Sequence, residues 1–367
     1  MACIFVARER LNASLRPQTT ARCFRPFFHP MFRKILYTLL KLLVASAAVY
    51  WLQKKVDAQN VLRVLRDADP VFFGVAFLLG LLNLLNGGFR WNRLLGALRI
   101  SIPVGTLTAI AQIGQFFAVF LPGTAGDDVT RLVYIARLAP GRVREACATV
   151  LLDRVIGLSC LFMLAFVCIP ANWNLLQGQP STRWIATGFL FAGGAVLLGG
   201  TLFFSLSAVT LNRLIDRFES PFKQFGFVTE LAAMARAFGG SRGTLALVIA
   251  AALLTQSMIC AGFYFAGRAV GIELPLFSWM SFVPVIVASS ALPITFAGIG
   301  VREYLLLLFV GSAAVAVDQE RILAASLLVL ALGLLMALLG GLVYLLYRPS
   351  AVVDSVGGVE GAADGGH

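Results

Sequence analysis

Histidine and charged side chains are scarce in this chain of 367 residues. Its two histidines are His29 and His367, and Asp, Glu, Lys and Arg together make up only 13% of the residues. Because both histidines lie outside the long apolar runs, we expect neither a histidine-based metal site nor a Ser-His triad in the apolar part. A soluble domain with an ordinary surface is excluded too, because such domains carry about twice this fraction of charge.

Several motifs are also missing. The chain has no GxxxxGK[ST] loop, so we expect no nucleotide hydrolysis, and the sequence predicts no cofactor. The six cysteines occur singly, without a CxxC pair, which favours packing in the interior over a metal or redox site. The first 30 residues lack the apolar core and cleavage site of a secretory signal.

Long apolar runs dominate what is present. Apolar residues make up 59% of the chain, and the mean hydropathy is +0.85. The runs are continuous rather than alternating, which is typical of helices and not of barrel strands. We predict an all-α polytopic membrane protein with about eight transmembrane helices, two apolar segments being broken or re-entrant.

The predicted organisation is a membrane domain with two short ends. We expect an integral membrane domain at 31–348 and a disordered tail at 349–367. Residues 1–30 would be disordered or a translation-start artefact, with Met31 as the true start, and a transit peptide is the rival interpretation. Lys and Arg gather before the first span and at 90–99, 131–144 and 213–242, so the net charge of +12 indicates a cytoplasmic N-terminus rather than nucleic-acid binding.

Apolar segments alternate with polar ones along this domain. Residues 53–69 predict an amphipathic interfacial helix, 170–184 an external loop, and 208–243 an amphipathic cytoplasmic hairpin. Pro and Gly interrupt 104–121 and 276–297 at their ends, so we expect these two to be the broken or re-entrant segments. The apolar segments are 35–52, 71–89, 104–121, 146–169, 185–206, 244–266, 276–297, 304–317 and 322–347.

One motif occurs twice. The first copy reads LPGTAGDDVTR from Leu121 to Arg131, and the second reads LPITFAGIGVRE from Leu292 to Glu303. Both contain Leu-Pro, a threonine two residues after the proline and an arginine nine residues after it. Paired breaks in matching positions of two halves point to a binding site at a repeat interface. The sequence therefore predicts an internal repeat with a polar site.

Charges gather at these breaks, although a central Asp or Arg costs about 2.5–3.5 kcal/mol to insert in a membrane. Glycine-flanked amides and a helix starting near Asp128 would attract an anion, so we predict two cradles for the phosphate of a lipid head group. The predicted binding residues are Asp128, Arg131, Asp153, Arg154, Arg302, Glu303, Gly126, Gly298 and Gly300.

A purely structural role for these charges stays open. Asp128 would then cap its helix and pair with Arg131, while Asp153 would hold Arg131 or the adjacent Arg154. This interpretation does not explain why both copies break at Leu-Pro and place an arginine at the same distance.

Three stretches carry a resemblance: GDDVTR at 126–131, LLDRVIGL at 151–158 and GIGVRE at 298–303. Together they resemble the signatures of the lysylphosphatidylglycerol synthase transmembrane (flippase) domain family, over nearly the whole chain from Met31. The resemblance implies a bacterial inner-membrane protein whose relatives move phospholipids between leaflets. Asp127 stands where that family has a second glycine, and Asp153 where it usually has Glu. The extra acid would disfavour an anionic head group or select a cationic one.

We therefore expect a flippase or transporter of a membrane phospholipid, not an enzyme. The soluble aminoacyl-transfer domain of the full-length synthases is not expected, because no globular segment follows Tyr347. A membrane-embedded transferase that uses Asp127 or Asp128 as base or metal ligand stays open, as does a non-transporting partner of a lipid-modifying enzyme. Homo-oligomerisation is also open, and a nucleic-acid partner is not expected.

Overall fold

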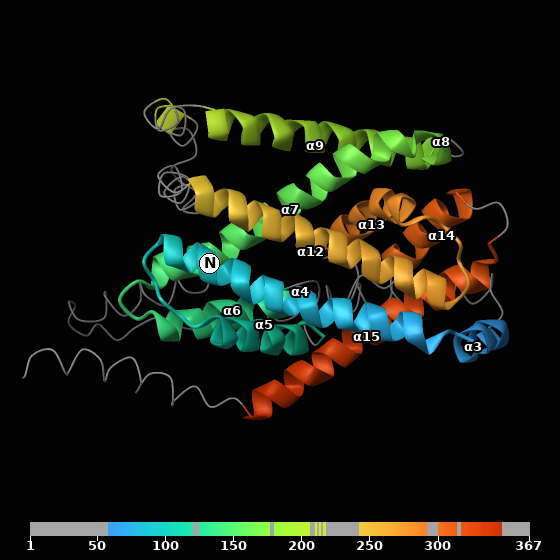
Figure 1. The fold of residues 1–367 in the computed structure, drawn as a ribbon, viewed down its shortest axis with the longest axis horizontal. Coiled ribbons are helices and arrows are strands. Elements are labelled where there is room, and N and C mark those ends of the chain that lie inside the picture. The colour runs from blue at the N-terminus through green and yellow to red at the C-terminus, as the bar shows by residue number, and fades with distance from the viewer. Residues whose placement is uncertain are drawn as a thin grey trace, which may run out of the picture. The chain divides into compact units, whose positions relative to one another are not determined.

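Figure 1 shows the helices in the computed structural model, which describes residues 58–119, 125–176, 180–205, 210, 213, 216–217, 242–291, 300–313 and 317–346. All secondary-structure elements in the described residues are α-helices, which confirms the predicted all-α class. The predicted first span, the Leu-Pro pairs of both motif copies, most of the predicted 208–243 hairpin and both chain ends lie outside the described residues. The helices are α3 (Ala58–Arg66), α4 (Pro70–Ala97), α5 (Val104–Ala118), α6 (Ala125–Leu138), α7 (Val143–Ala171), α8 (Trp173–Leu176), α9 (Pro180–Ser205), α12 (Arg242–Ala269), α13 (Leu276–Ala291), α14 (Val301–Ala313) and α15 (Gln319–Leu346).

Five of the described helices are long and apolar enough to cross a bilayer, namely α4, α7, α9, α12 and α15. Large apolar side chains on their outer faces are open, Phe191 being 76% and Leu345 80% exposed. Such apolar faces can contact the hydrocarbon chains of lipids. The backbone N–H and C=O groups need no partner in the lipid, because they form hydrogen bonds within each helix. The chain is therefore a multi-pass membrane protein, as its composition predicts.

The connection before α9 differs from the prediction. Residues 170–184 were expected to form one external loop, but α7 runs to Ala171 and α9 already begins at Pro180. Proline suits the first position of a helix, because its missing N–H would have no partner there. The segment 53–69 does contain a helix, α3, as its amphipathic pattern predicts.

Two pairs of shorter helices stand between the long ones. Helices α5 and α6 have 15 and 14 residues, and α13 and α14 have 16 and 13. At 1.5 Å per residue each is about 20–24 Å long, short of a hydrocarbon core of about 30 Å. Helix α5 packs on α6, and α13 packs on α14. A side chain at Gly126 would collide with the backbone of Phe117, so this glycine allows the first pair to close.

Helices α4 and α12 run antiparallel and side by side (Figure 1). At one end, the Asp69 N–H donates to the Ala269 carbonyl over 2.9 Å. Further along, the Asn86 side-chain amide donates to the Ala251 carbonyl over 2.7 Å. Because the two helices are antiparallel, the chain enters α5 and α13 from opposite ends of this pair.

The same cap ends both helices. After α4, Arg99 has a φ of 58° and the Ile100 N–H donates to the Leu95 carbonyl; after α12, Gly271 has a φ of 78° and the Ile272 N–H donates to the Gly267 carbonyl. This six-to-one bond after a left-handed residue is a Schellman cap. It turns the chain sharply towards the short helix that follows.

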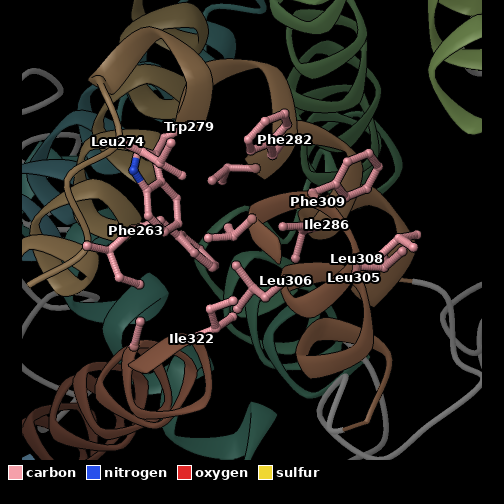
Figure 2. Packing of buried hydrophobic residues seen from close by; sticks show 14 of the residues in the cluster. Phe263, Leu274, Trp279, Phe282, Ile286, Leu305, Leu306, Leu308, Phe309 and Ile322 are labelled. Carbon is pink, nitrogen blue, oxygen red and sulfur yellow. The ribbon is translucent and has the colours of Figure 1, made fainter. Parts of the chain in front are cut away.

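Each pair of short helices has its own apolar core. Trp91, Ile110 and Ile135 are buried around α5 and α6. Around α13 and α14, Figure 2 shows Trp279, Phe282, Phe309 and Ile322 packed together, with the Phe282 and Phe309 rings stacked at 5.5 Å between centroids. Each pair also contacts a long helix distant in the sequence, since α5 packs on α15 and α13 packs on α7.

Candidate functional site

A buried ion pair joins α4 to α7. The Arg90 guanidinium donates to both carboxylate oxygens of Asp153, from Nε over 2.6 Å and from Nη2 over 2.9 Å. Arg90 also donates to the Thr255 hydroxyl of α12 over 3.2 Å, and Asn86, one turn earlier, donates to the same hydroxyl. The predicted binding residues do not include Arg90, which the sequence places among the Lys and Arg residues gathered at 90–99. Asn86 on the same face was the available signal.

Arg131 in α6 stands between two aspartates. Its Nε lies 2.7 Å from Asp127 Oδ1, and its Nη1 lies 3.6 Å from Asp153 Oδ2. The Trp91 ring lies 5.6 Å from its guanidinium carbon, a cation–π distance. Arg131 therefore joins α6 to the Arg90–Asp153 pair.

Arg154 in α7 binds both neighbouring acids of α6. Its Nη2 lies 2.6 Å from Asp127 Oδ2, and its Nε lies 2.6 Å from Asp128 Oδ1. Both carboxylates that a transferase would use as base or metal ligand are thus engaged by arginine.

These residues form one chain of alternating charge, which we call the charge ladder: Arg90, Asp153, Arg131, Asp127, Arg154 and Asp128. Three arginines balance three aspartates, so its formal charge is zero. The side chains of the first four residues are 5–14% exposed, whereas those of Arg154 and Asp128 are 36% and 30% exposed. The ladder therefore has a buried end at Arg90 and an open end at Asp128.

Of the two partners predicted for Asp153, the structure shows Arg131, at 3.6 Å, and not the adjacent Arg154, because consecutive helical residues point about 100° apart. Two other details of this region differ from the prediction. Arg131 pairs with Asp127, four residues before it, rather than with Asp128. Helix α6 begins at Ala125, ahead of the expected start near Asp128. Even so, the predicted residues Asp128, Arg131, Asp153 and Arg154 do come together.

A second, smaller cluster lies at the start of α14. Glu303 accepts from the Gly300 N–H over 2.6 Å and from Arg302 Nη2 over 2.7 Å. Ser326 of α15 donates to Glu303 over 2.7 Å and accepts from Arg302 Nε over 3.0 Å. The predicted residues Gly300, Arg302 and Glu303 therefore come together, and Ser326 is an addition. Gly300 has a φ of 93°, a backbone conformation that favours glycine, and its N–H is the donor to Glu303. Gly298 lies outside the described residues.

The two clusters lie at different positions along the long helices. Thr255, at the ladder, is in the middle of α12, about 20 Å from Ala269 at 1.5 Å per residue. Arg321, close to Ser326 in α15, instead donates to the Gly271 carbonyl, just past that end of α12. No interaction between described residues joins the ladder to Glu303 or Arg302 directly.

Comparison with known proteins identifies the family. No curated protein matches the chain. The family model described as Lysylphosphatidylglycerol synthase TM region matches residues 38–349, which include every helix described above and both copies of the motif. The chain therefore belongs to the lysylphosphatidylglycerol synthase TM region family.

Proposed function

We propose that this membrane protein is a flippase that moves a phospholipid between the leaflets of a bacterial inner membrane, with its N-terminus in the cytoplasm. The observation that carries the proposal is the charge ladder. Charged residues inside an apolar bundle are costly and usually mark the path of a polar substrate. The ladder offers arginines to a head-group phosphate and opens towards one end. Membership of a family named for a lipid synthase fits a lipid substrate.

The fold part of the proposal is that the two short-helix pairs are re-entrant hairpins of an inverted internal repeat. Four parallels support it: the Leu-Pro motif, the Schellman caps, the opposite directions from which α5 and α13 enter, and the crossed packing of α5 on α15 and α13 on α7. In addition, Arg131 and Arg302, which match in the motif, are each held from the next long helix, by Asp153 and Ser326.

Such a repeat gives each leaflet one polar site. The ladder, with Asp128, Arg131, Asp153 and Arg154, would receive the head group on one side. The cluster of Gly300, Arg302 and Glu303 would receive it on the other. Inverted repeats that rock against each other expose a site to one side at a time. Lipid movement then needs no nucleotide.

The test is reconstitution of the purified full chain into vesicles with acyl-chain-labelled phospholipids. We expect the protein to speed exchange between leaflets, and Arg131→Ala to abolish most of that gain, because Asp127 and Asp153 lose the arginine between them. Arg93→Ala is the matched control, since it removes one exposed arginine from α4 that lies over the Phe89 ring, away from the ladder contacts. Absence of exchange for every phospholipid, with Arg131→Ala equal to wild type, would refute the proposal.

A further inference from the structure

The open end of the ladder differs from its interior in more than exposure. Asp127 is held by two arginines, Arg131 at 2.7 Å and Arg154 at 2.6 Å. Among the described residues, Asp128 forms an ion pair with Arg154 alone, at 2.6 Å. The Arg154–Asp128 contact is therefore the one that a ligand can open while the other charges stay paired.

Opening this contact frees one positive and one negative group together. A purely anionic head group would satisfy Arg154 and leave the carboxylate of Asp128 beside an added negative charge. A purely cationic group would satisfy Asp128 and leave Arg154 with Asp127 only. The side chains of Arg154 and Asp128 are 36% and 30% exposed, so both are partly removed from water, and a charge that loses a counter-charge there costs free energy. Either ligand would therefore bind at a penalty.

Resting on the proposed flippase function, we infer that the ladder selects a zwitterionic head group by ion-pair exchange. The phosphate takes the Arg154 Nε position that Asp128 occupies, and an ammonium group a few ångströms away takes the Asp128 carboxylate. Each positive group in the site then has a negative partner, both before and after the exchange. Asp128 is then the residue that determines specificity, and Arg154 is the phosphate-binding residue.

This exchange also explains why the ladder is graded in exposure. The pair Arg90–Asp153 is buried and bidentate, so it fixes α4 to α7. Arg131 and Asp127 link that fixed pair to the open end. A head group that arrives at Asp128 can therefore exchange one contact without taking the helices apart.

The experiment compares leaflet exchange of two acyl-chain-labelled lipids in vesicles that contain the full chain. One is zwitterionic phosphatidylethanolamine, and the other is anionic phosphatidylglycerol. We expect wild type to move the zwitterionic lipid about tenfold faster, the ratio that a difference of about 1.4 kcal/mol gives. Asp128→Asn leaves the ladder with one excess positive charge and should reverse the preference, whereas Arg154→Gln should slow both lipids.

A matched control separates selectivity from general damage. Glu145→Gln removes one acid of α7 from an exposed pair with Arg142, the residue before this helix, outside the ladder, and should keep the wild-type preference. Folding of each variant is checked by its thermal unfolding in detergent. Equal rates for the two lipids in wild type, or faster movement of the anionic lipid, would overturn the inference and leave the flippase proposal standing. An Asp128→Asn variant that unfolds as wild type and keeps the zwitterionic preference would do the same. Exchange of neither lipid above protein-free vesicles would instead overturn the flippase proposal itself.

Discussion

Arg90 and Asp153 are 63 positions apart in the sequence, and the Arg90 guanidinium donates a hydrogen bond to each oxygen of the Asp153 carboxylate, over 2.6 and 2.9 Å. The contact joins the C-terminal third of α4 to α7, and the Arg90 hydrogen bond to Thr255 adds α12. Because Arg131 reaches the same carboxylate, this pair is also the anchor of the charge ladder. Its removal should therefore affect stability more than the loss of any exposed pair.

Single replacements of the anchor should be costly. Arg90→Met leaves the Asp153 carboxylate without its bidentate partner, and Asp153→Leu leaves the guanidinium unpaired, so each should destabilise the protein by about 3–5 kcal/mol. The double variant should lose less than the two single losses combined, because neither charge is then left alone. Thermal unfolding in detergent measures the cycle. Additive losses would show that the two side chains act independently.

A methyl group placed between α5 and α6 should disturb the ladder directly. The side chain of Gly114→Ala would meet the carboxylate of Asp127, which holds Arg131 and Arg154. We expect a loss of about 1–3 kcal/mol from overpacking, together with slower lipid exchange. Gly105→Ala is the control on the same helix, since its methyl meets no atom within 4 Å. Equal behaviour of the two variants would contradict the tight contact.

The second cluster depends on one hydroxyl. Ser326 is fully buried and serves both Arg302 and Glu303, so Ser326→Ala leaves two charged groups short of a hydrogen bond. We expect a loss of about 1–3 kcal/mol in unfolding free energy. Thr187→Ala removes a hydroxyl that, at an exposed position of α9, donates to the Arg183 carbonyl one turn earlier, and should change stability by less than about 0.5 kcal/mol. An unchanged free energy of unfolding in Ser326→Ala would mean that these hydrogen bonds do not stabilise the protein.

Labelling tests the proposed inverted repeat. Ser101 precedes α5 and Glu273 precedes α13, and both are exposed in the turns that follow α4 and α12. In a chain without its native cysteines, Ser101→Cys and Glu273→Cys should react with a membrane-impermeant maleimide from opposite sides of sealed, oriented vesicles. Reaction of both from one side would exclude the inverted repeat.

The membrane character of the chain is a local property, and the sequence predicts it for that reason. A helix satisfies its own backbone, so a long apolar run is sufficient to indicate a span, as at α12 and α15. Helix ends are less local. Pro180 begins α9 within a stretch whose two tryptophans, Trp173 and Trp184, favour an external loop.

The motif and its charged residues were also visible in the sequence, because an Asp or Arg beside an apolar run stands out whatever its partners. Asp128, Arg131, Asp153 and Arg154 were identified in this way, and they do lie together. Arg90 was overlooked because it begins a basic segment that also suits the membrane surface.

What the tertiary structure decided is the order of the pairs. Adjacency in the sequence favours a pair between Asp153 and Arg154. In the structure, Asp153 binds Arg90 and Arg131. Arg154 instead binds Asp127 and Asp128. Neighbouring positions on a helix face different partners, and which partner each meets depends on how α4, α6 and α7 pack. The sequence alone thus determined that Asp127 and Asp128 are charged residues beside a helix break. Only the packing of three helices made Asp127 the interior of a ladder and Asp128 its open end.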